Sequence, residues 1–363
     1  MFKPRTIDEI KDDIRSRVGK RAPFLHADKA EAEEALAKLD TIETETWAAA
    51  WSGIGARWEE KARAGERRGD AKQAKDAFIK AYGYYGIARH PFPDSPAKER
   101  AYAKTREMYL AASRYFDIPL ECVAIPFDGK QIVAHLRFPK KVPAPLVMHW
   151  GGIDNWKEER LTFAEAFVRE GWGCFVMDSP GTGECPIPAS PEAHRVHSAA
   201  LDYLVKRREV DPKRIAVVGA SFGGYWATKM AHVEPERLAA AVNWGGGVHY
   251  FFQPEWQEKS RNAPSYLFDL IEARANLFGK KTFEELIAVM PALSLKTQGW
   301  LDKPCAPMLL VNGKEDKQVP LEDCYLLLEH GEPKAMRLFA GGHMGSSPDI
   351  FKTVLSWLHS KLD

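Results

Sequence analysis

The stretch RIAVVGASFGGYWATKM, residues 214–230, joins a β-branched apolar run to helix-forming residues through a serine flanked by glycines. Gly219, Ser221 and Gly223 fit the pattern G-x-S-x-G, in which a nucleophilic serine occupies a sharp turn between a strand and a helix. Such a turn exposes the hydroxyl, and the first amides of the helix point toward an anion forming beside it. An ordinary glycine-rich turn also fits five residues, but the predicted strand and helix on either side favour a nucleophile.

Strand-like and helical runs alternate on both sides of this stretch. Strands are predicted at 120–127, 131–138, 144–150, 173–178, 214–219, 238–244, 306–313 and 334–340. Several of these runs are apolar without a break, as expected of parallel strands that are covered on both faces. The alternation predicts an α/β fold with a mostly parallel sheet and helices on both faces. Residues from about 250 to 298 interrupt the rhythm, and we interpret them as an insertion between two strands.

The chain before this region has a different pattern. Residues 1–118 are rich in Ala, Glu, Lys and Arg and carry apolar residues at helical spacing, for example over 46–58, 74–88 and 105–116. Glycine or proline with acidic residues breaks the pattern at 65–70 and 90–96. We therefore predict two domains, a helical one over 1–118 and an α/β one over 119–363.

Composition excludes several classes of function. The 363 residues are 45% hydrophobic, and 51 Lys and Arg balance 50 Asp and Glu. This balance provides no field that would attract nucleic acid or an anionic membrane surface, so neither partner is expected. The charged first residues lack the apolar core of a secretory signal, and no run reaches the length of a membrane span, so the predicted location is the cytoplasm.

No metal site or cofactor site is predicted. The five cysteines are scattered without a CxxC pair. His194 and His197 lack the rest of a zinc motif and are expected on a solvated helix face. The G-T-G of residues 181–183 lacks the remainder of a dinucleotide fingerprint, and Asp178 is expected to cap nearby backbone. The expected partner is a small-molecule substrate, with a homodimer as one possible assembly.

A nucleophilic serine needs a base, and the base needs an acid to fix its tautomer. In this kind of fold the order along the chain is serine, acid, histidine. Asp316 follows the predicted strand 306–313 and is the candidate acid, with adjacent Glu315 as the competitor. His343 follows the last predicted strand in a glycine-lined loop and is the candidate base. Asp323 is expected inside the next helix, facing solvent.

An oxyanion formed at the serine needs two amide donors. The amide of Phe222, directly after the serine, is the first candidate. The second is expected from the turn that follows the strand 144–150, where Ile153 is the first choice and Gly152 the next. Paired glycines at 151–152 allow backbone to approach a substrate closely, although they also fit a simple tight turn.

These motifs, G-A-S-F-G-G, G-K-E-D-K-Q-V-P and G-G-H-M-G, resemble those of the α/β-hydrolases over residues 119–363. The helical N-terminal segment, G-G-I-D-N-W-K-E-E and D-S-P-G-T-G-E are similar to the subgroup that contains 2,6-dihydroxypseudooxynicotine hydrolase, fungal polyketide-shortening hydrolases and fermentation–respiration switch esterases. The resemblance implies that residues 1–118 cap the catalytic face. It also implies either ester hydrolysis or cleavage of a carbon–carbon bond beside a ketone, the latter with an extra acidic group that Glu255 or Asp154 would supply.

The sequence thus predicts a serine hydrolase that forms an acyl-enzyme with an aromatic or polyketide-like ester or β-ketone. Aromatic residues in the segments expected to cover the site are candidate substrate contacts, namely Tyr85, Tyr250, Phe251 and Trp256, with Glu255 beside them. For Tyr85 and its neighbours, packing between helices explains the residues equally well. The alternative is a catalytically retired scaffold whose helical domain docks another protein.

Overall fold

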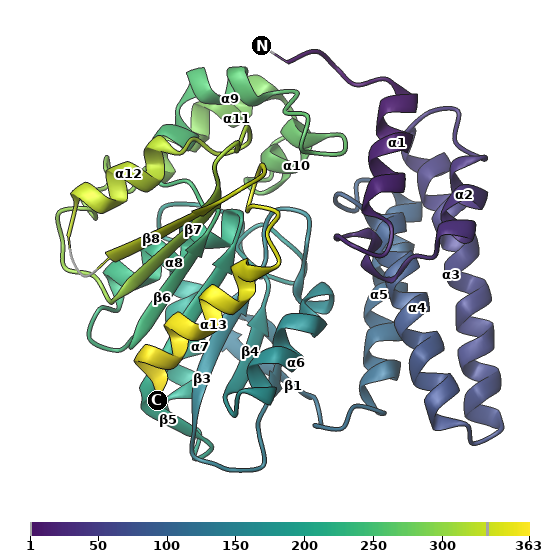
Figure 1. Ribbon diagram of the computed structural model, residues 1–363, viewed down its shortest axis with the longest axis horizontal. Helices are drawn as coiled ribbons and strands as arrows, with labels where there is room; N and C mark the ends of the chain where they lie inside the picture. The colour runs from purple at the N-terminus through teal and green to yellow at the C-terminus, as the bar shows by residue number, and fades with distance from the viewer. Residues whose placement is uncertain (1, 332–333) are drawn as a thin grey trace. The chain divides into compact units, whose positions relative to one another are not determined.

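The computed structural model describes residues 2–331 and 334–363. The chain divides into two compact units, shown in Figure 1. The smaller unit consists of Pro4–Leu120 together with Leu267–Asp269, and the larger contains Glu121–Tyr266 and Leu270–Asp363. Three residues from the middle of the larger unit's sequence therefore belong to the helical unit, a feature that the sequence did not indicate.

One sheet of eight strands forms the centre of the larger unit. The strands are β1 (Glu121–Phe127), β2 (Lys130–Arg137), β3 (Ala144–Trp150), β4 (Gly173–Met177), β5 (Val210–Ala220), β6 (Ala240–Trp244), β7 (Met308–Gly313) and β8 (Lys334–Phe339). Their order is β1-β2-β4-β3-β5-β6-β7-β8. Strand β2 runs antiparallel to β1 and β4, and all pairs from β4 to β8 are parallel. The predicted fold class and all eight predicted strands are confirmed.

Helices cover both faces of this sheet. Figure 1 shows α6 (Leu161–Arg169) and α13 (Asp349–Leu362) on one face, where Phe163 and Phe351 bring their ring centroids to 5.2 Å. On the other face lie α7 (Arg195–Leu204) and α8 (Phe222–Val233), joined by a contact between His197 and Trp226. Strands β3 to β7 are buried along their whole length, as unbroken apolar runs require, except at residues 211–214 of β5.

Short helices separate β6 from β7, where the sequence predicts an insertion. They are α9 (Pro254–Ser260), α10 (Leu270–Asn276) and α11 (Phe283–Val289), with 3-10 turns at Tyr250–Phe252 and Met290–Leu293. A further 3-10 turn, Lys157–Arg160, precedes α6, and α12 (Glu322–Glu329) lies between β7 and β8. None of the three helices between β6 and β7 exceeds two turns, so their arrangement depends on packing rather than on intrinsic helix stability.

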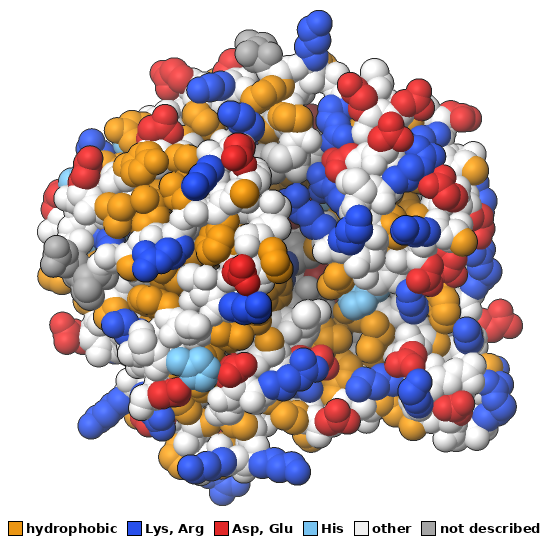
Figure 2. Space-filling model, viewed as in Figure 1, with side chains coloured by type: hydrophobic (Ala, Val, Ile, Leu, Met, Phe, Trp, Pro, Cys, Tyr) orange, Lys and Arg blue, Asp and Glu red, His pale blue; other side chains and the backbone are white. Residues whose placement is uncertain are grey.

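Five helices build the smaller unit: α1 (Ile7–Arg17), α2 (Lys29–Leu36), α3 (Thr44–Arg67), α4 (Ala71–Arg89) and α5 (Pro96–Ser113), with a 3-10 turn at Phe24–His26. Its core gathers Trp47 and Trp51 of α3 with Phe24 and with Phe268, whose ring centroid lies 4.8 Å from that of Trp47. The tyrosines of α4 are buried in this unit. On the face that Figure 2 shows, its acidic and basic side chains are interspersed, consistent with the balanced composition.

Two predictions about polar residues outside the site are wrong. His197 does not lie on a solvated face, because it is fully buried in α7 between Trp150 and Trp226. Asp323 lies inside α12, as expected, but it is also fully buried. In the part of the chain that the structure describes, no helix combines the length and apolar character needed to cross a bilayer.

Candidate active site

Ser221 occupies the turn between β5 and α8. Its φ of 56° lies in the left-handed region, which few residues other than glycine adopt without strain. A Cβ atom on Gly219 would lie 1.9 Å from the carbonyl oxygen of Gly223, and a Cβ on Gly223 would lie 2.5 Å from that of Gly151. The turn therefore needs glycine at both flanking positions, which explains the spacing of the motif.

A continuous series of hydrogen bonds connects Ser221 with His343 and Asp316. Ser221 Oγ lies 2.7 Å from His343 Nε2, and His343 Nδ1 lies 2.8 Å from Asp316 Oδ2. Asp316 follows β7 and His343 follows β8, so both side chains emerge at the carboxyl ends of neighbouring parallel strands. The structure brings the three sequence-predicted residues together, although 122 positions separate the serine from the histidine.

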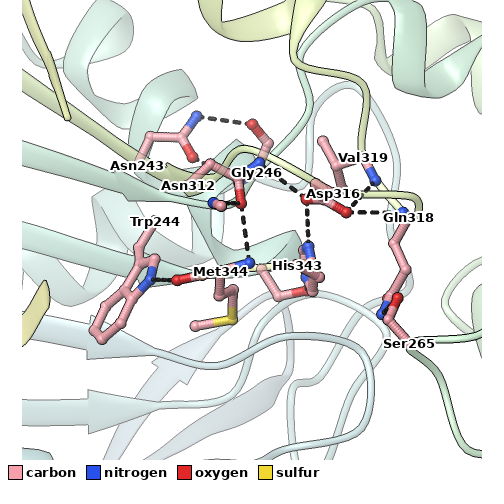
Figure 3. Close-up of polar contacts among 12 residues, drawn as sticks. Asn243, Trp244, Gly246, Ser265, Asn312, Asp316, Gln318, Val319, His343 and Met344 are labelled. Atoms are coloured by element: carbon pink, nitrogen blue, oxygen red, sulfur yellow. Dashed lines mark hydrogen bonds and ion pairs between the residues drawn. The ribbon is translucent and has the colours of Figure 1, made fainter. Parts of the chain in front are cut away.

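Asp316 is held by donors on every side (Figure 3). Its Oδ1 accepts the amides of Gln318 and Val319, and its Oδ2 also accepts Asn312 Nδ2 at 2.9 Å. Burial alone raises the pKa of this carboxyl, but the charge and hydrogen bond of His343 and the other donors outweigh burial and lower the pKa below its usual value. Adjacent Glu315 is exposed, so Asp316 is the carboxylate that reaches the histidine.

The loop that carries His343 is fixed by its neighbours. Met344 adopts a φ of 67°, and its amide donates to Asn312 Oδ1 at 2.9 Å. Its carbonyl oxygen accepts the indole N–H of Trp244 at 2.8 Å (Figure 3). Because Asn312 contacts both Asp316 and Met344, one side chain at the end of β7 positions the acid and the loop of the base together.

The turn after β3 lies directly against the serine. A Cβ atom on Gly152 would lie 2.8 Å from Ser221 Cβ and 3.1 Å from Ser221 Oγ, so only glycine fits there. Ile153 and Phe222 line a small cavity together with Ser221 and His343. Within the described residues, neither the Ile153 amide nor the Phe222 amide donates a hydrogen bond. Both candidate donors are thus available beside the serine.

A buried cluster of charged side chains holds the segment that follows this turn. Asp178 accepts the backbone amides of Lys157 and Glu184, which confirms its predicted capping role. The sequence did not indicate that Lys157 Nζ also forms ion pairs with Asp178, Glu184 and Glu158, at 3.0, 2.7 and 2.9 Å. Three carboxylates around one buried ammonium fix the segment that follows Ile153.

Of the sequence-predicted substrate contacts, Phe251 alone lines this cavity. The cavity wall does not include Tyr250, Glu255 or Trp256. Tyr250 is 40% exposed, Glu255 is exposed, and Trp256 donates its indole N–H to Gln318 O. Tyr85 lies in the helical unit, where its hydroxyl donates to Glu59. Asp154, the other candidate for an extra acid, is also absent from the wall.

Asp323 is buried and positions Phe251, whereas the sequence predicts that its side chain faces solvent. Its Oδ1 accepts the amides of His249 and Tyr250, and its Oδ2 accepts that of Phe251 at 2.9 Å. Burial raises the pKa of Asp323 to about 6 although these backbone donors oppose the rise. No sequence pattern signals this contact, because its partners lie more than 70 residues away.

Further residues complete the cavity wall, namely Gly247, Leu270, Arg274, Gln318 and Val319. Sequence reasoning missed all of them. Leu270 and Arg274 come from the short helix α10, which has no amphipathic pattern long enough to interpret. Among the described residues, no group of three or more His, Cys, Asp and Glu side chains is arranged to hold a metal ion.

Comparison with known proteins agrees with this geometry. A family model described as "Esterase FrsA-like" matches residues 5–339, which is most of the chain. The chain belongs to the FrsA-like esterase family. The predicted resemblance to α/β-hydrolases of the switch-esterase subgroup is thereby confirmed, and the chain is a hydrolase that acts on a small-molecule substrate.

Curated members of the FrsA-like family cover most of the chain. Esterase FrsA of Photobacterium profundum is 27% identical over 344 residues, which are 89% of this chain and 79% of that protein. Esterase FrsA of Vibrio vulnificus is 28% identical over 297 residues, which are 78% of this chain and 69% of that protein.

Solved structures show the same fold over nearly the whole length of this FrsA-like chain. 2,6-Dihydroxy-pseudo-oxynicotine hydrolase superposes with a TM-score of 0.78 at 23% identity and covers 97% of this chain and 95% of its own. Wild-type AbyA5 gives a TM-score of 0.76 at 22% identity, covering 98% and 93%. At these identities the likeness concerns the fold alone.

Proposed function

We propose that this chain is a serine esterase in which Ser221 attacks the carbonyl of a small-molecule carboxylic ester. The observation that supports this most strongly is the unbroken series of short hydrogen bonds from Ser221 Oγ through His343 to Asp316. In the proposed reaction, His343 takes the proton of Ser221 as the oxygen attacks and then gives it to the leaving alcohol. Water, activated by the same histidine, releases the acid from the acyl-enzyme.

Each remaining part of the site has a role in this scheme. Asp316 stays ionised, because its pKa is lowered, and holds the proton of His343 on Nδ1 so that Nε2 faces the serine. The amides of Phe222 and Ile153 stabilise the negative oxygen that develops in the transition state. Such preorganised donors contribute on the order of 100-fold to 1000-fold each in comparable enzymes.

An aromatic or otherwise planar substrate suits the apolar part of the wall. Phe222, Phe251, Leu270 and Val319 surround the serine with apolar surface, which favours burial of a ring or a short chain. The same groups would cleave a carbon–carbon bond beside a ketone if the departing carbon were stabilised as an anion. Membership of an esterase family favours ester hydrolysis over carbon–carbon cleavage. Assaying 1,3-diketones beside the esters tests the second reaction.

Hydrolysis by three purified proteins tests the proposal. We expect wild type to release 4-nitrophenol from short 4-nitrophenyl esters and Ser221→Ala to lose at least about 1000-fold in kcat. Ser198→Ala is the matched control, since Ser198 lies in α7, donates its hydroxyl to Glu234 and is not part of the cavity wall. Ser221→Ala with wild-type turnover, or a folded wild type inactive on every ester and diketone, would favour the retired scaffold.

A further inference from the structure

The wall of the cavity contains a buried guanidinium that the proposed chemistry does not use. Arg274, in α10, is 2% exposed and lines the cavity with Ser221, His343 and Phe251. All four residues belong to the larger unit. Removing a permanent charge from water is costly unless partners compensate for the lost hydration, so the partners of Arg274 indicate its role.

The partners that Arg274 has within the described residues are neutral. Nη1 donates to Gln257 Oε1 at 2.7 Å and to Ser260 Oγ at 2.9 Å, and Nη2 donates to the carbonyl oxygen of Gln318 at 3.2 Å. The guanidinium carbon also lies 4.9 Å from the centroid of the Phe251 ring. A guanidinium has five N–H donors, so one on Nε and one on Nη2 remain for a ligand.

The positive charge of Arg274 has no direct counter-ion among the described carboxylates. Asp316 and Tyr266 act on Arg274 only through space, and Asp316 is hydrogen-bonded to His343. Burial lowers the pKa of Arg274 to about 10, so the group stays charged at neutral pH. Of the residues that line the cavity, Arg274 is the one with a permanent positive charge.

Surrounding contacts fix the guanidinium in place before any ligand binds. Gln257 and Ser260 are fully buried, and Gln257 Nε2 donates to the carbonyl oxygen of Phe251. Gln318, whose carbonyl oxygen accepts from Arg274, is held through its amide on Asp316 and through its side chain on Ser265. An ordered donor pair loses little entropy when it binds an anion.

We propose that Arg274 binds a carboxylate carried by the substrate, so that the enzyme prefers esters with one negative charge. This inference rests on the proposed function in placing the scissile ester at Ser221. A carboxylate matches the planar fork of a guanidinium. A phosphate dianion fits less well, since a single cation lines the cavity and the negative Asp316 lies near it.

The first test measures ligand binding to a variant that cannot hydrolyse the ester. In the Ser221→Ala background, calorimetry compares 4-acetoxybenzoate with neutral 4-acetoxybenzamide, which has nearly the same shape. We expect the anion to bind at least about tenfold tighter, as hydrogen bonds to charged groups typically give. Arg274→Gln should reduce the difference to within about threefold, and Arg274→Lys should retain part of it. Arg137→Gln, which removes a buried guanidinium in β2 away from the cavity wall, should leave the difference unchanged.

Turnover of a second pair measures the same selectivity on the acyl side. The substrates are 4-nitrophenyl 4-carboxybenzoate and 4-nitrophenyl 4-carbamoylbenzoate, which share one leaving group. We expect wild type to favour the anion in kcat/KM by at least about tenfold and Arg274→Gln to lose this preference. If Arg274→Gln does not fold, the wild-type ratio and Arg274→Lys still decide the question.

The outcomes separate this inference from the proposed function. Selective binding of the anion without turnover of either substrate would support Arg274 and contradict the esterase mechanism. Two results together would overturn the role of Arg274: equal kcat/KM for the two 4-nitrophenyl esters, and equal affinity for 4-acetoxybenzoate and 4-acetoxybenzamide. An equal loss on charged and neutral substrates in Arg274→Gln would also overturn it, because that pattern identifies a structural counter-charge for Asp316.

Discussion

Asp316 and Glu315 are adjacent carboxylates in very different surroundings. Glu315 is exposed, whereas Asp316 is 6% exposed and accepts hydrogen bonds from His343, from Asn312 and from two backbone amides. Sequence reasoning placed both in the loop after the strand and chose Asp316 as the acid, with Glu315 as its competitor. Contacts from Asn312 and from the amides that follow Asp316 supply a physical reason for that choice.

We expect Asp316→Asn to lower kcat about 1000-fold to 10,000-fold while leaving the fold intact. The new amide would donate to Nδ1 and place the ring proton on Nε2, where the imidazole cannot accept the proton of Ser221. Steady-state kinetics with a 4-nitrophenyl ester measures the loss, and Glu315→Gln is the matched control with near wild-type activity. Retention of activity within about tenfold in Asp316→Asn would contradict the assigned role.

At the scale of elements, the sequence indicated the sheet and the loops that follow its strands. Unbroken apolar runs located β3 to β7, and the glycines at 219 and 223 located the turn before α8. The segment between β6 and β7 was not interpretable in the same way. Phe251 and Arg274 lie at the cavity only because short helices pack there, and that packing involves contacts such as Asp323 with residues far away in the sequence.

The turn before α8 makes a prediction for the element as a whole. A Cβ on Gly223 would lie 2.5 Å from the carbonyl oxygen of Gly151 and 2.9 Å from that of Trp150, so Gly223→Ala must displace α8 from the turn after β3. We expect a lower melting temperature and at least about a 100-fold loss of kcat/KM, because a shift of catalytic groups by about 1 Å has such an effect on the rate. Gly53→Ala in α3 is the control, since apart from the neighbouring residues and backbone of its own helix no atom lies within 4 Å of its Cβ, and it should stabilise the helix by about 0.5–1 kcal/mol. Equal behaviour of the two variants would contradict the packing argument.

At the scale of the whole molecule, buried histidines contribute to how stability depends on pH. Burial lowers the pKa of His135, His149 and His197 to about 3, with nearby positive charge adding to the effect. Each is neutral in the folded protein and becomes protonated on unfolding below about pH 6.5. The unfolded state therefore binds more protons between about pH 6.5 and pH 3, and stability falls as pH falls through this window.

His197→Phe tests this dependence, since neither ring nitrogen of His197 has a hydrogen-bond partner among the described residues and the ring packs against Trp150 and Trp226. We expect the free energy of unfolding to decrease less between pH 7 and pH 4 in the variant than in wild type. Urea denaturation at several pH values, followed by tryptophan fluorescence, measures the difference. Parallel pH profiles for the two proteins would show that His197 does not contribute.

The central claim is that Ser221 is a nucleophile activated by His343 and Asp316. Treatment of the folded chain with a fluorophosphonate, followed by digestion and mass spectrometry, locates any covalent adduct directly. We expect one adduct, on the peptide that contains Ser221, with labelling strongly slowed in Asp316→Asn and absent in Ser221→Ala. Folded wild-type protein that leaves Ser221 unmodified, or that labels at an unchanged rate in Asp316→Asn, would contradict the claim.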